Sequence, residues 1–157
     1  MWTHEPPGYD CPFCRLVRGV ETDHNRFDDI VWRDELTMAL IAPKWWPHNH
    51  GHVIVVPIEH VENIYSIDDA LLGAVYATAK RVAIALKEAY ACDGTSTRQH
   101  NEPAGYQDVW HLHVHVFPRY EGDDLYRLHE EQHWATPEER APYATRLRAA
   151  IAESDSA

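Results

Sequence analysis

The sequence has little of several features that mark particular protein classes. It contains 3 cysteines and 7 glycines among 157 residues, and its 14 basic residues against 25 acidic ones give a net charge of −11. So few cysteines exclude a scaffold built on disulfides and suit a reducing compartment. The acidic charge argues against binding duplex nucleic acid through a basic surface, so we expect no nucleic-acid partner.

Long apolar runs are also missing. The longest, around residues 53–56, is far too short to span a bilayer. The first residues show no basic start followed by an apolar segment, as a signal peptide would. We therefore expect a cytoplasmic protein with no membrane partner. With 45% hydrophobic and 25% charged residues, the composition is that of an ordinary globular chain, and we expect a single domain.

Apolar periodicity and turn residues predict a chain that mixes strands and helices. The longest helical pattern begins after Asp68 and ends before Gly94. Thr136, Pro137 and Glu139 form a helix start with a capping box. In chain order we expect a helix at 13–19, strands at 30–33 and 36–42, a loop at 43–52, a strand buried on both faces at 53–56, a helix at 69–91, strands at 96–101 and 111–116, and a helix at 136–152 with a fraying tail.

The most unusual stretch is His111-Leu112-His113-Val114-His115-Val116, in which polar and apolar residues alternate strictly. Alternation predicts a strand with the histidines in a row on one face, roughly 6.6 Å apart per step. Imidazoles this close cannot all be charged, so they share protons or bind a metal. Strand propensity alone would favour Thr, Tyr or Val at these positions. The pattern therefore indicates catalysis, with a metal-only site and a plain solvent-facing strand as the alternatives.

Two further motifs remain open to more than one interpretation. Cys11-Pro12-Phe13-Cys14 is a redox pair, half of a zinc site or a chance occurrence. A redox motif would follow a strand, and none is predicted before it, whereas a zinc site needs two further ligands elsewhere. Trp45 and Trp46 in the expected loop wall a pocket or an interface, or belong to the core.

These motifs, in this order, resemble the histidine-triad (HIT) family of nucleotide-binding hydrolases and transferases, in its bacterial zinc-containing form. Residues 111–117 match the family's His-φ-His-φ-His-φ-φ signature, Gln107-Asp108-Val109-Trp110 resembles its lead-in, and residues 51–60 resemble its Gly-His-φ-φ-Val-φ-Pro-x-x-His segment. The resemblance covers about residues 11–120 of a single HIT domain at 1–157, with about 121–157 as a C-terminal extension. It implies an α+β fold with a five-stranded antiparallel sheet, one long helix and a C-terminal helix, pairing into a ten-stranded sheet in a homodimer.

The resemblance also implies an activity and the residues that perform it. The chain would hydrolyse or transfer a nucleotidyl group of purine nucleoside phosphoramidates or related conjugates through a nucleotidyl-His113 intermediate. His115 would contact the α-phosphate and the leaving group, and Gln107 would donate to one of them. The candidates for nucleotide binding are His52, His100, Asn101, Arg119 and Lys44. A structural zinc would be held by Cys11, Cys14, His60 and His111, and no organic cofactor is expected.

Four positions depart from the family pattern. His100, followed by Asn101, stands where the family places Asn or Gln near the leaving group. Lys44 stands where the family often has an acid or asparagine on the ribose, and Tyr106 replaces a glycine and would crowd the phosphate site. Asp108 would repel phosphate unless it is turned away. Three alternatives therefore stay open: a dinucleoside polyphosphate hydrolase like the Fhit branch, a nucleotide-binding regulatory protein with negligible turnover, and a zinc protein that uses the triad as a metal site. A uridylyltransferase is disfavoured because His115 is present.

Overall fold

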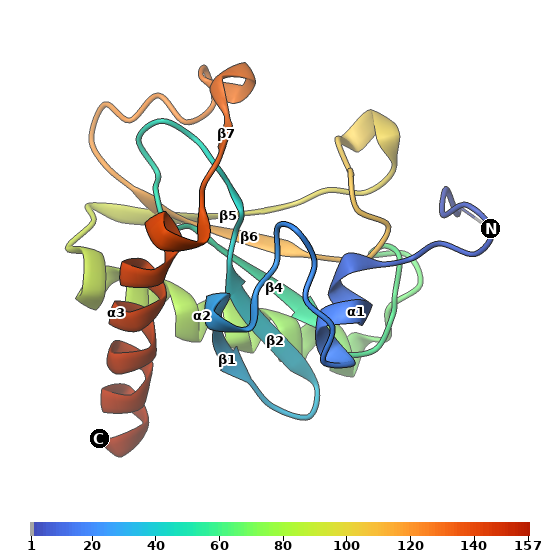
Figure 1. The fold of residues 1–157 in the computed structure, drawn as a ribbon, viewed down its shortest axis with the longest axis horizontal. Helices are drawn as coiled ribbons and strands as arrows, with labels where there is room; N and C mark the ends of the chain where they lie inside the picture. The colour runs from blue at the N-terminus through green and yellow to red at the C-terminus, as the bar shows by residue number, and fades with distance from the viewer. Residues whose placement is uncertain (1) are drawn as a thin grey trace.

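The computed structural model describes residues 2–157 and contains a five-stranded antiparallel sheet with helices on both faces (Figure 1). In spatial order its strands are β1 (Ile30–Arg33), β2 (Thr37–Ile41), β4 (Val53–Pro57), β6 (Val114–Arg119) and β5 (Gly94–Gln99). The helices are α1 (Pro12–Val17), α2 (Asp69–Tyr90) and α3 (Pro137–Ser156), with 3-10 turns at Phe27–Asp29, Pro103–Gly105 and His129–Glu131. This confirms the predicted α+β fold and its five-stranded sheet.

The central strand β4 shows why the sheet needs a helix on each side. Val53 and Val55 pack into the larger core under α2, whereas Ile54 and Val56 pack on the opposite face with α1. Successive side chains of a strand point to opposite faces, so an apolar run requires cover on both. The prediction of a strand buried on both faces is confirmed.

The long helix α2 was predicted within one residue at each end. The side chain of Asp68 accepts from the backbone N–H of Leu71, which satisfies one of the free donors of the first turn. The helix ends at Tyr90 and is followed by the capping residue Ala91 in a left-handed conformation with φ 51°, whereas Gly94 begins β5. Across residues 2–157 no helix combines the length and the apolar character needed to cross a membrane.

The C-terminal helix is longer than expected. Thr136 and Glu139 form the predicted capping box, but α3 continues to Ser156, so the predicted end at about 152 is wrong. A buried ion pair between Arg140 and Asp29, 2.8 Å from Nε to Oδ1, attaches α3 to the turn before β1. In Figure 1, α3 lies on the opposite side of the molecule from α1.

The expected loop at 43–52 is partly a strand. Lys44–Trp45 forms β3, which pairs antiparallel with β7 (His133–Trp134) in a separate two-stranded sheet. The prolines and the glycine around this segment predicted a loop. The strand was missed because it has two residues and its partner is almost 90 positions further along the chain. The pairing brings the C-terminal segment back to the main sheet, above β5 and β6 in Figure 1.

The histidine-rich strand begins later than predicted. β6 starts at Val114, so His111 and His113 precede it. The amide of Leu112 donates to the carbonyl of Val61 at 2.7 Å, and that of His111 to Val109 at 2.8 Å, so neither joins the ladder. The alternation of faces nevertheless continues through this segment, because Leu112, Val114 and Val116 all lie in the core under α2.

Candidate active site and metal cluster

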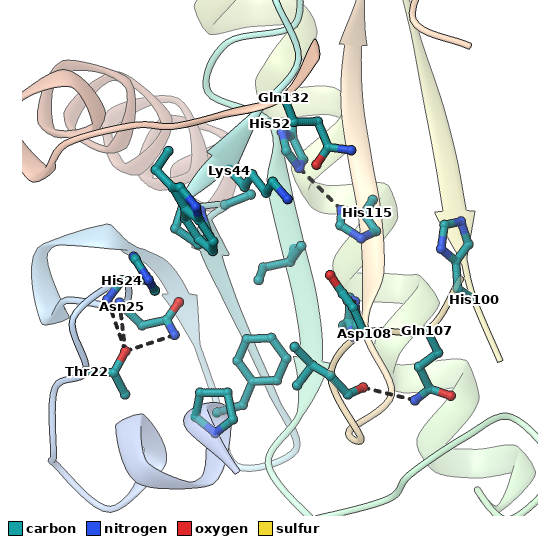
Figure 2. Close-up of a pocket in the computed structure, with 18 of the residues that line it drawn as sticks. Thr22, His24, Asn25, Lys44, His52, His100, Gln107, Asp108, His115 and Gln132 are labelled. Atoms are coloured by element: carbon teal, nitrogen blue, oxygen red, sulfur yellow. Dashed lines mark hydrogen bonds and ion pairs between the residues drawn. The ribbon is translucent and has the colours of Figure 1, made fainter. Parts of the chain in front are cut away.

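A cavity of about 700 Å³ opens on the α1 face of the sheet (Figure 2). It extends from β4 and β6 to α1 and to the loops at 21–25, 100–109 and 129–134. Six predicted site residues line it: Lys44, His52, His100, Gln107, His113 and His115. The structure therefore brings together residues that are up to 71 positions apart (44 to 115).

His113 is buried, and only one of its ring nitrogens is engaged. Its Nδ1 lies 2.8 Å from the carbonyl oxygen of His111, so Nδ1–H donates and the proton is fixed on that side of the ring. The lone pair of Nε2 is left free at the cavity. Asp108 is the nearest carboxylate, with Oδ1 3.8 Å from Nε2 and a side chain that is 80% exposed. The carboxylate therefore faces the imidazole rather than turning away, and an anion would approach against its charge.

His115 and His52 form a neutral pair, shown by the dashed line in Figure 2. Burial lowers the pKa of His52 to about 3 and holds that of His115 well below its usual range, with the neighbouring histidines and Arg98 acting in the same direction on His115. His52 Nε2 and His115 Nδ1 are 3.3 Å apart, and His52 Nδ1 has no partner. A buried acceptor without a partner is more common in proteins than a buried N–H without one. The partnerless Nδ1 of His52 is therefore the unprotonated nitrogen, and Nε2–H donates to His115 Nδ1. His115 then carries its proton on Nε2, as a donor.

The loop before the triad presents a third neutral imidazole. His100 Nδ1–H donates to the carbonyl of Tyr106 at 3.2 Å, and burial lowers the pKa of His100. Tyr106 takes a left-handed conformation with φ 67° and is 70% exposed. Its side chain therefore lies at the mouth of the cavity, over His129. It does not fill the site, contrary to the expectation from the sequence.

Gln107 lines the cavity, but its amide is occupied. Nε2 donates to the carbonyls of Glu62 at 2.6 Å and Val109 at 3.0 Å, and Oε1 accepts from the amide of Glu102 at 2.9 Å. Both amide protons are used by the backbone, so in this conformation Gln107 holds the loop in shape instead of offering a donor to a ligand.

Two predicted binding residues lie outside the cavity wall. Asn101 accepts from the amide of Ile64 and exchanges hydrogen bonds with Gln99. Arg119 forms two hydrogen bonds with the carboxylate of Asp123, at 2.7 and 2.9 Å. The structure thus places neither of them with the histidines.

Aromatic residues form other parts of the cavity wall. Trp46 packs edge-on to His52 and Phe117, so it is a pocket wall, whereas Trp45 belongs to the main core. Trp134 of β7 stacks on His24, with ring centroids 3.8 Å apart and planes 14° from parallel. No local motif marks the loop at 21–25, because only tertiary folding brings it to the triad.

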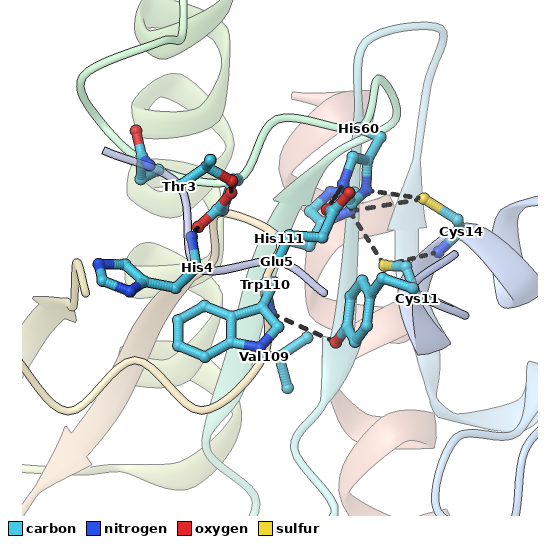
Figure 3. Close-up of polar contacts among 12 residues, drawn as sticks. Thr3, His4, Glu5, Cys11, Cys14, His60, Val109, Trp110 and His111 are labelled. Carbon is cyan, nitrogen blue, oxygen red and sulfur yellow. Dashed lines mark hydrogen bonds and ion pairs between the residues drawn. The ribbon is translucent and has the colours of Figure 1, made fainter. Parts of the chain in front are cut away.

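The four predicted metal ligands form a separate cluster beside the cavity (Figure 3). Their donor atoms are the two sulfurs and the Nδ1 atoms of both histidines. Cys11 Sγ and Cys14 Sγ lie 3.3 and 3.6 Å from His111 Nδ1, Cys14 Sγ lies 3.2 Å from His60 Nδ1, and the two nitrogens are 3.2 Å apart. A tetrahedral zinc with normal bond lengths has ligand–ligand edges of roughly 3.3 to 3.8 Å. The donor set and its size therefore fit zinc.

The outer nitrogens of this cluster are also arranged for a metal. His111 Nε2–H donates to the carbonyl of Pro57 at 2.9 Å, and His60 Nε2 contacts the carboxylate of Glu5. Both rings therefore direct an unprotonated Nδ1 towards the sulfurs, as metal-bound histidines do. Burial raises the pKa of Cys11 to about 12 and lowers that of His111 to about 4. A buried thiolate needs a cation for compensation, and a metal ion would supply it.

A family model of the HIT domain matches residues 24–122, which is more than half of the chain. The chain belongs to the HIT family. HIT proteins are nucleotide-binding hydrolases and transferases, so the resemblance noted in the sequence is confirmed at this level. The match includes the triad and His60, whereas Cys11 and Cys14 lie before it.

Relatives within the HIT family agree with this assignment. A HIT-like protein of Methanocaldococcus jannaschii is 32% identical over 114 residues, which are 72% of this chain and 81% of that protein. Adenylylsulfatase HINT3 of Arabidopsis thaliana is 26% identical over 74% of this chain and 56% of its own length. A crystal structure of a zinc-bound histidine triad family protein from Mycobacterium smegmatis superposes with a TM-score of 0.77 at 28% identity, covering 94% of this chain and 96% of the other.

Proposed function

We propose that this HIT protein hydrolyses purine nucleoside phosphoramidates or related adenylyl conjugates through a nucleotidyl-His113 intermediate. The observation that carries the proposal is the state of His113, whose Nδ1–H donates to the His111 carbonyl at 2.8 Å while Nε2 stays free at the cavity. A fixed tautomer with an exposed lone pair is what a nucleophilic imidazole needs. The HINT3 relative, named an adenylylsulfatase, supports an adenylyl substrate.

The neighbouring residues suit the two steps of such a reaction. His113 Nε2 forms a bond to the α-phosphorus while the bond to the leaving group breaks, and the leaving group takes the electron pair. His115 Nε2–H donates a hydrogen bond to the phosphate or to the leaving atom and keeps its proton, because the ring is neutral; the leaving atom takes the proton that it needs from solvent water. Water then attacks the phosphorus, the bond to His113 breaks, and the nucleoside monophosphate is released.

A dinucleoside polyphosphate is the second candidate substrate. The cavity of about 700 Å³ continues past Lys44 to the stacked rings of Trp134 and His24, so its wall extends well beyond the histidines. A lysine at this end would favour a substrate that carries a further anionic group there. The same histidines would attack either substrate, so the length of the cavity, not the nucleophile, would decide between them.

The proposal is tested by turnover of a fluorogenic adenosine phosphoramidate and of a diadenosine polyphosphate, with the wild type and His113→Ala. We expect the wild type to cleave at least one of the two and the variant neither. The preferred substrate then separates the two candidates. AMP binding without turnover of either compound would contradict the hydrolase and leave the regulatory alternative.

We also propose that Cys11, Cys14, His60 and His111 hold a structural zinc. All four positions of a tetrahedral ion would be filled by protein, so the metal has no open site for substrate. Bound there, zinc would neutralise the thiolates and attach α1 to the segment that carries His113. One zinc per chain, bound equally by wild type and His113→Ala, is the expected result of metal analysis; two per chain would instead favour a triad that binds metal.

We also propose that the chain forms the homodimer that the family resemblance implies. β5 is the last strand of the sheet order, and α2, which contacts β5, carries the exposed apolar side chains of Tyr76 and Ile84. A second copy pairing there would cover them. We expect wild type to sediment as a dimer and Ile84→Glu to shift it towards monomer, while a wild-type monomer would contradict the proposal.

A further inference from the structure

Two arginines share the sheet face of the cavity histidines, but their surroundings differ. Both lie near the ring of Tyr126, Arg119 at 5.0 Å and Arg98 at 5.5 Å from its centroid. Arg119 is neutralised by Asp123. Among residues 2–157, no carboxylate lies within ion-pair distance of Arg98. Only one of the two positive charges is therefore available to act on other groups.

The register of the sheet places Arg98 beside the triad. It lies directly opposite His115 in the β5–β6 pair, and residues opposite each other project from the same face with Cβ atoms about 5 Å apart. Its guanidinium lies 5.4 Å from the ring centroid of Trp46 and 5.5 Å from that of Phe117. Nη1 is buried without a hydrogen-bond partner. Aromatic faces hold a cation in place without cancelling its charge.

A fixed positive charge matters at this position because the imidazoles around it are neutral. Burial is the main cause of the lowered pKa values of His52 and His115, and the charge of Arg98 lowers both further. Neutral imidazoles donate hydrogen bonds but do not attract an anion from a distance. The chain carries a net charge of −11, and Asp108 faces His113. Of the two basic residues in the cavity wall, Arg15 is paired with Asp10, so among the described residues Lys44 is the wall's one unpaired basic side chain against this negative charge.

We propose that Arg98 is a positioning residue whose charge draws the phosphate group of a nucleotide to His115. Arg98 is not among the residues that line the cavity, so it acts across His115 and not by contact. In an environment of low polarity, an unpaired charge acts over such a distance more strongly than it would in water. The inference rests on the nucleotide-binding function proposed above, and it requires binding only, not turnover.

The test compares the affinity for AMP with that for adenosine, which lacks the phosphate. Titration calorimetry would be run at low and high salt on the wild type, Arg98→Met, Arg98→Lys and Arg127→Met. The last is a matched control, because it removes the same charge from a side chain that is 85% exposed. We expect Arg98→Met to bind AMP about tenfold more weakly with a smaller salt dependence. Adenosine should bind unchanged, Arg98→Lys should retain most of the AMP affinity, and Arg127→Met should resemble the wild type.

A purely structural arginine would give a different pattern. Equal loss of AMP and adenosine binding in Arg98→Met, or failure of Arg98→Lys to retain AMP binding, would overturn the proposal. So would unchanged AMP affinity in Arg98→Met, or a wild type that binds AMP no more tightly than adenosine. The hydrolase proposal is judged separately, by turnover, since a wild type that shows the expected binding pattern but cleaves no substrate would end that proposal and leave this one standing.

Discussion

Two histidines separated by a single residue belong to sites of opposite character. His111 has both ring nitrogens engaged, Nε2 by the carbonyl of Pro57 and Nδ1 by the sulfurs of the cluster. His113 has one nitrogen engaged by the carbonyl of His111 and the other free at the cavity. Identical side chains thus differ in chemistry because of what occupies the second nitrogen. A closed site stabilises the fold, and an open one can react.

The largest effect should come from breaking the closed site. Cys14→Ala removes one of the four proposed zinc ligands and leaves a buried thiol and two imidazoles without the fourth donor. We expect loss of the metal and an unfolding temperature lower by about 10 °C, because metal binding contributes directly to folding. Metal analysis and calorimetry measure both. Cys92→Ala is the control, since Cys92 is buried at the end of α2, outside the cluster, and Cys14→Ala retaining a full zinc content would contradict the proposed site.

Breaking the open site should leave the closed one intact. His113→Ala removes the proposed nucleophile, and we expect turnover to fall by at least about 10³-fold while AMP affinity changes by less than about threefold. His111→Ala should instead lose the metal. Turnover and metal content measured on both variants test the separation. Loss of the metal in His113→Ala would mean that the two histidines serve one site.

Acid should reveal the neutral pair at the base of the cavity. The pKa of His52 is about 3 in the folded protein against 6.5 for the free side chain. Its contribution to stability is therefore complete above pH 6.5 and is lost as the pH falls towards 3, because only the unfolded chain takes up the proton. Between pH 7 and pH 5 this removes about 2 kcal/mol of unfolding free energy.

His52→Gln tests this account, because glutamine does not titrate. Denaturant unfolding at pH 7 and pH 5 should show a smaller loss for the variant than for the wild type. Any acid-induced release of metal affects both proteins equally, so the difference between them isolates His52. The same loss in both proteins would show that His52 does not stay neutral.

The smallest effect concerns the carboxylate that faces the open nitrogen. Asp108→Asn keeps the shape of the side chain and removes a negative charge 3.8 Å from His113 Nε2. We expect AMP to bind about threefold more tightly at low salt, a modest gain because the side chain is largely exposed. Glu153→Gln, an exposed change on α3, should have no effect. Weaker AMP binding in Asp108→Asn would show that this carboxylate assists the ligand.

Motifs with a short period could be interpreted from the sequence. The alternation at 111–116 indicated which side chains face the core, and the apolar run at 53–56 indicated a strand covered on both faces; both agree with the structure. The capping residues Asp68 and Thr136 placed two helix starts correctly. These features depend on neighbours within a few residues, so local chemistry determines them.

Arg119 and Arg98 show what local sequence motifs do not predict. Arg119 stood out in the sequence because it follows the triad, yet Asp123 neutralises it. Arg98 carried no motif, and only the pairing of β5 with β6 places it opposite His115. In the same way, Trp134 reaches the cavity because β7 pairs with β3.

The sequence by itself determined the mixture of strands and helices, the triad and the face that each histidine occupies, since these follow from strand and helix periods and from side-chain chemistry, whereas the four candidate metal ligands came from the resemblance to the HIT family. Tertiary structure alone decided which charges are neutralised, which amides are already occupied, as in Gln107, and which distant segments close the cavity. The physical reason is that a partner's distance in space, not in the chain, sets the strength of a hydrogen bond or an ion pair.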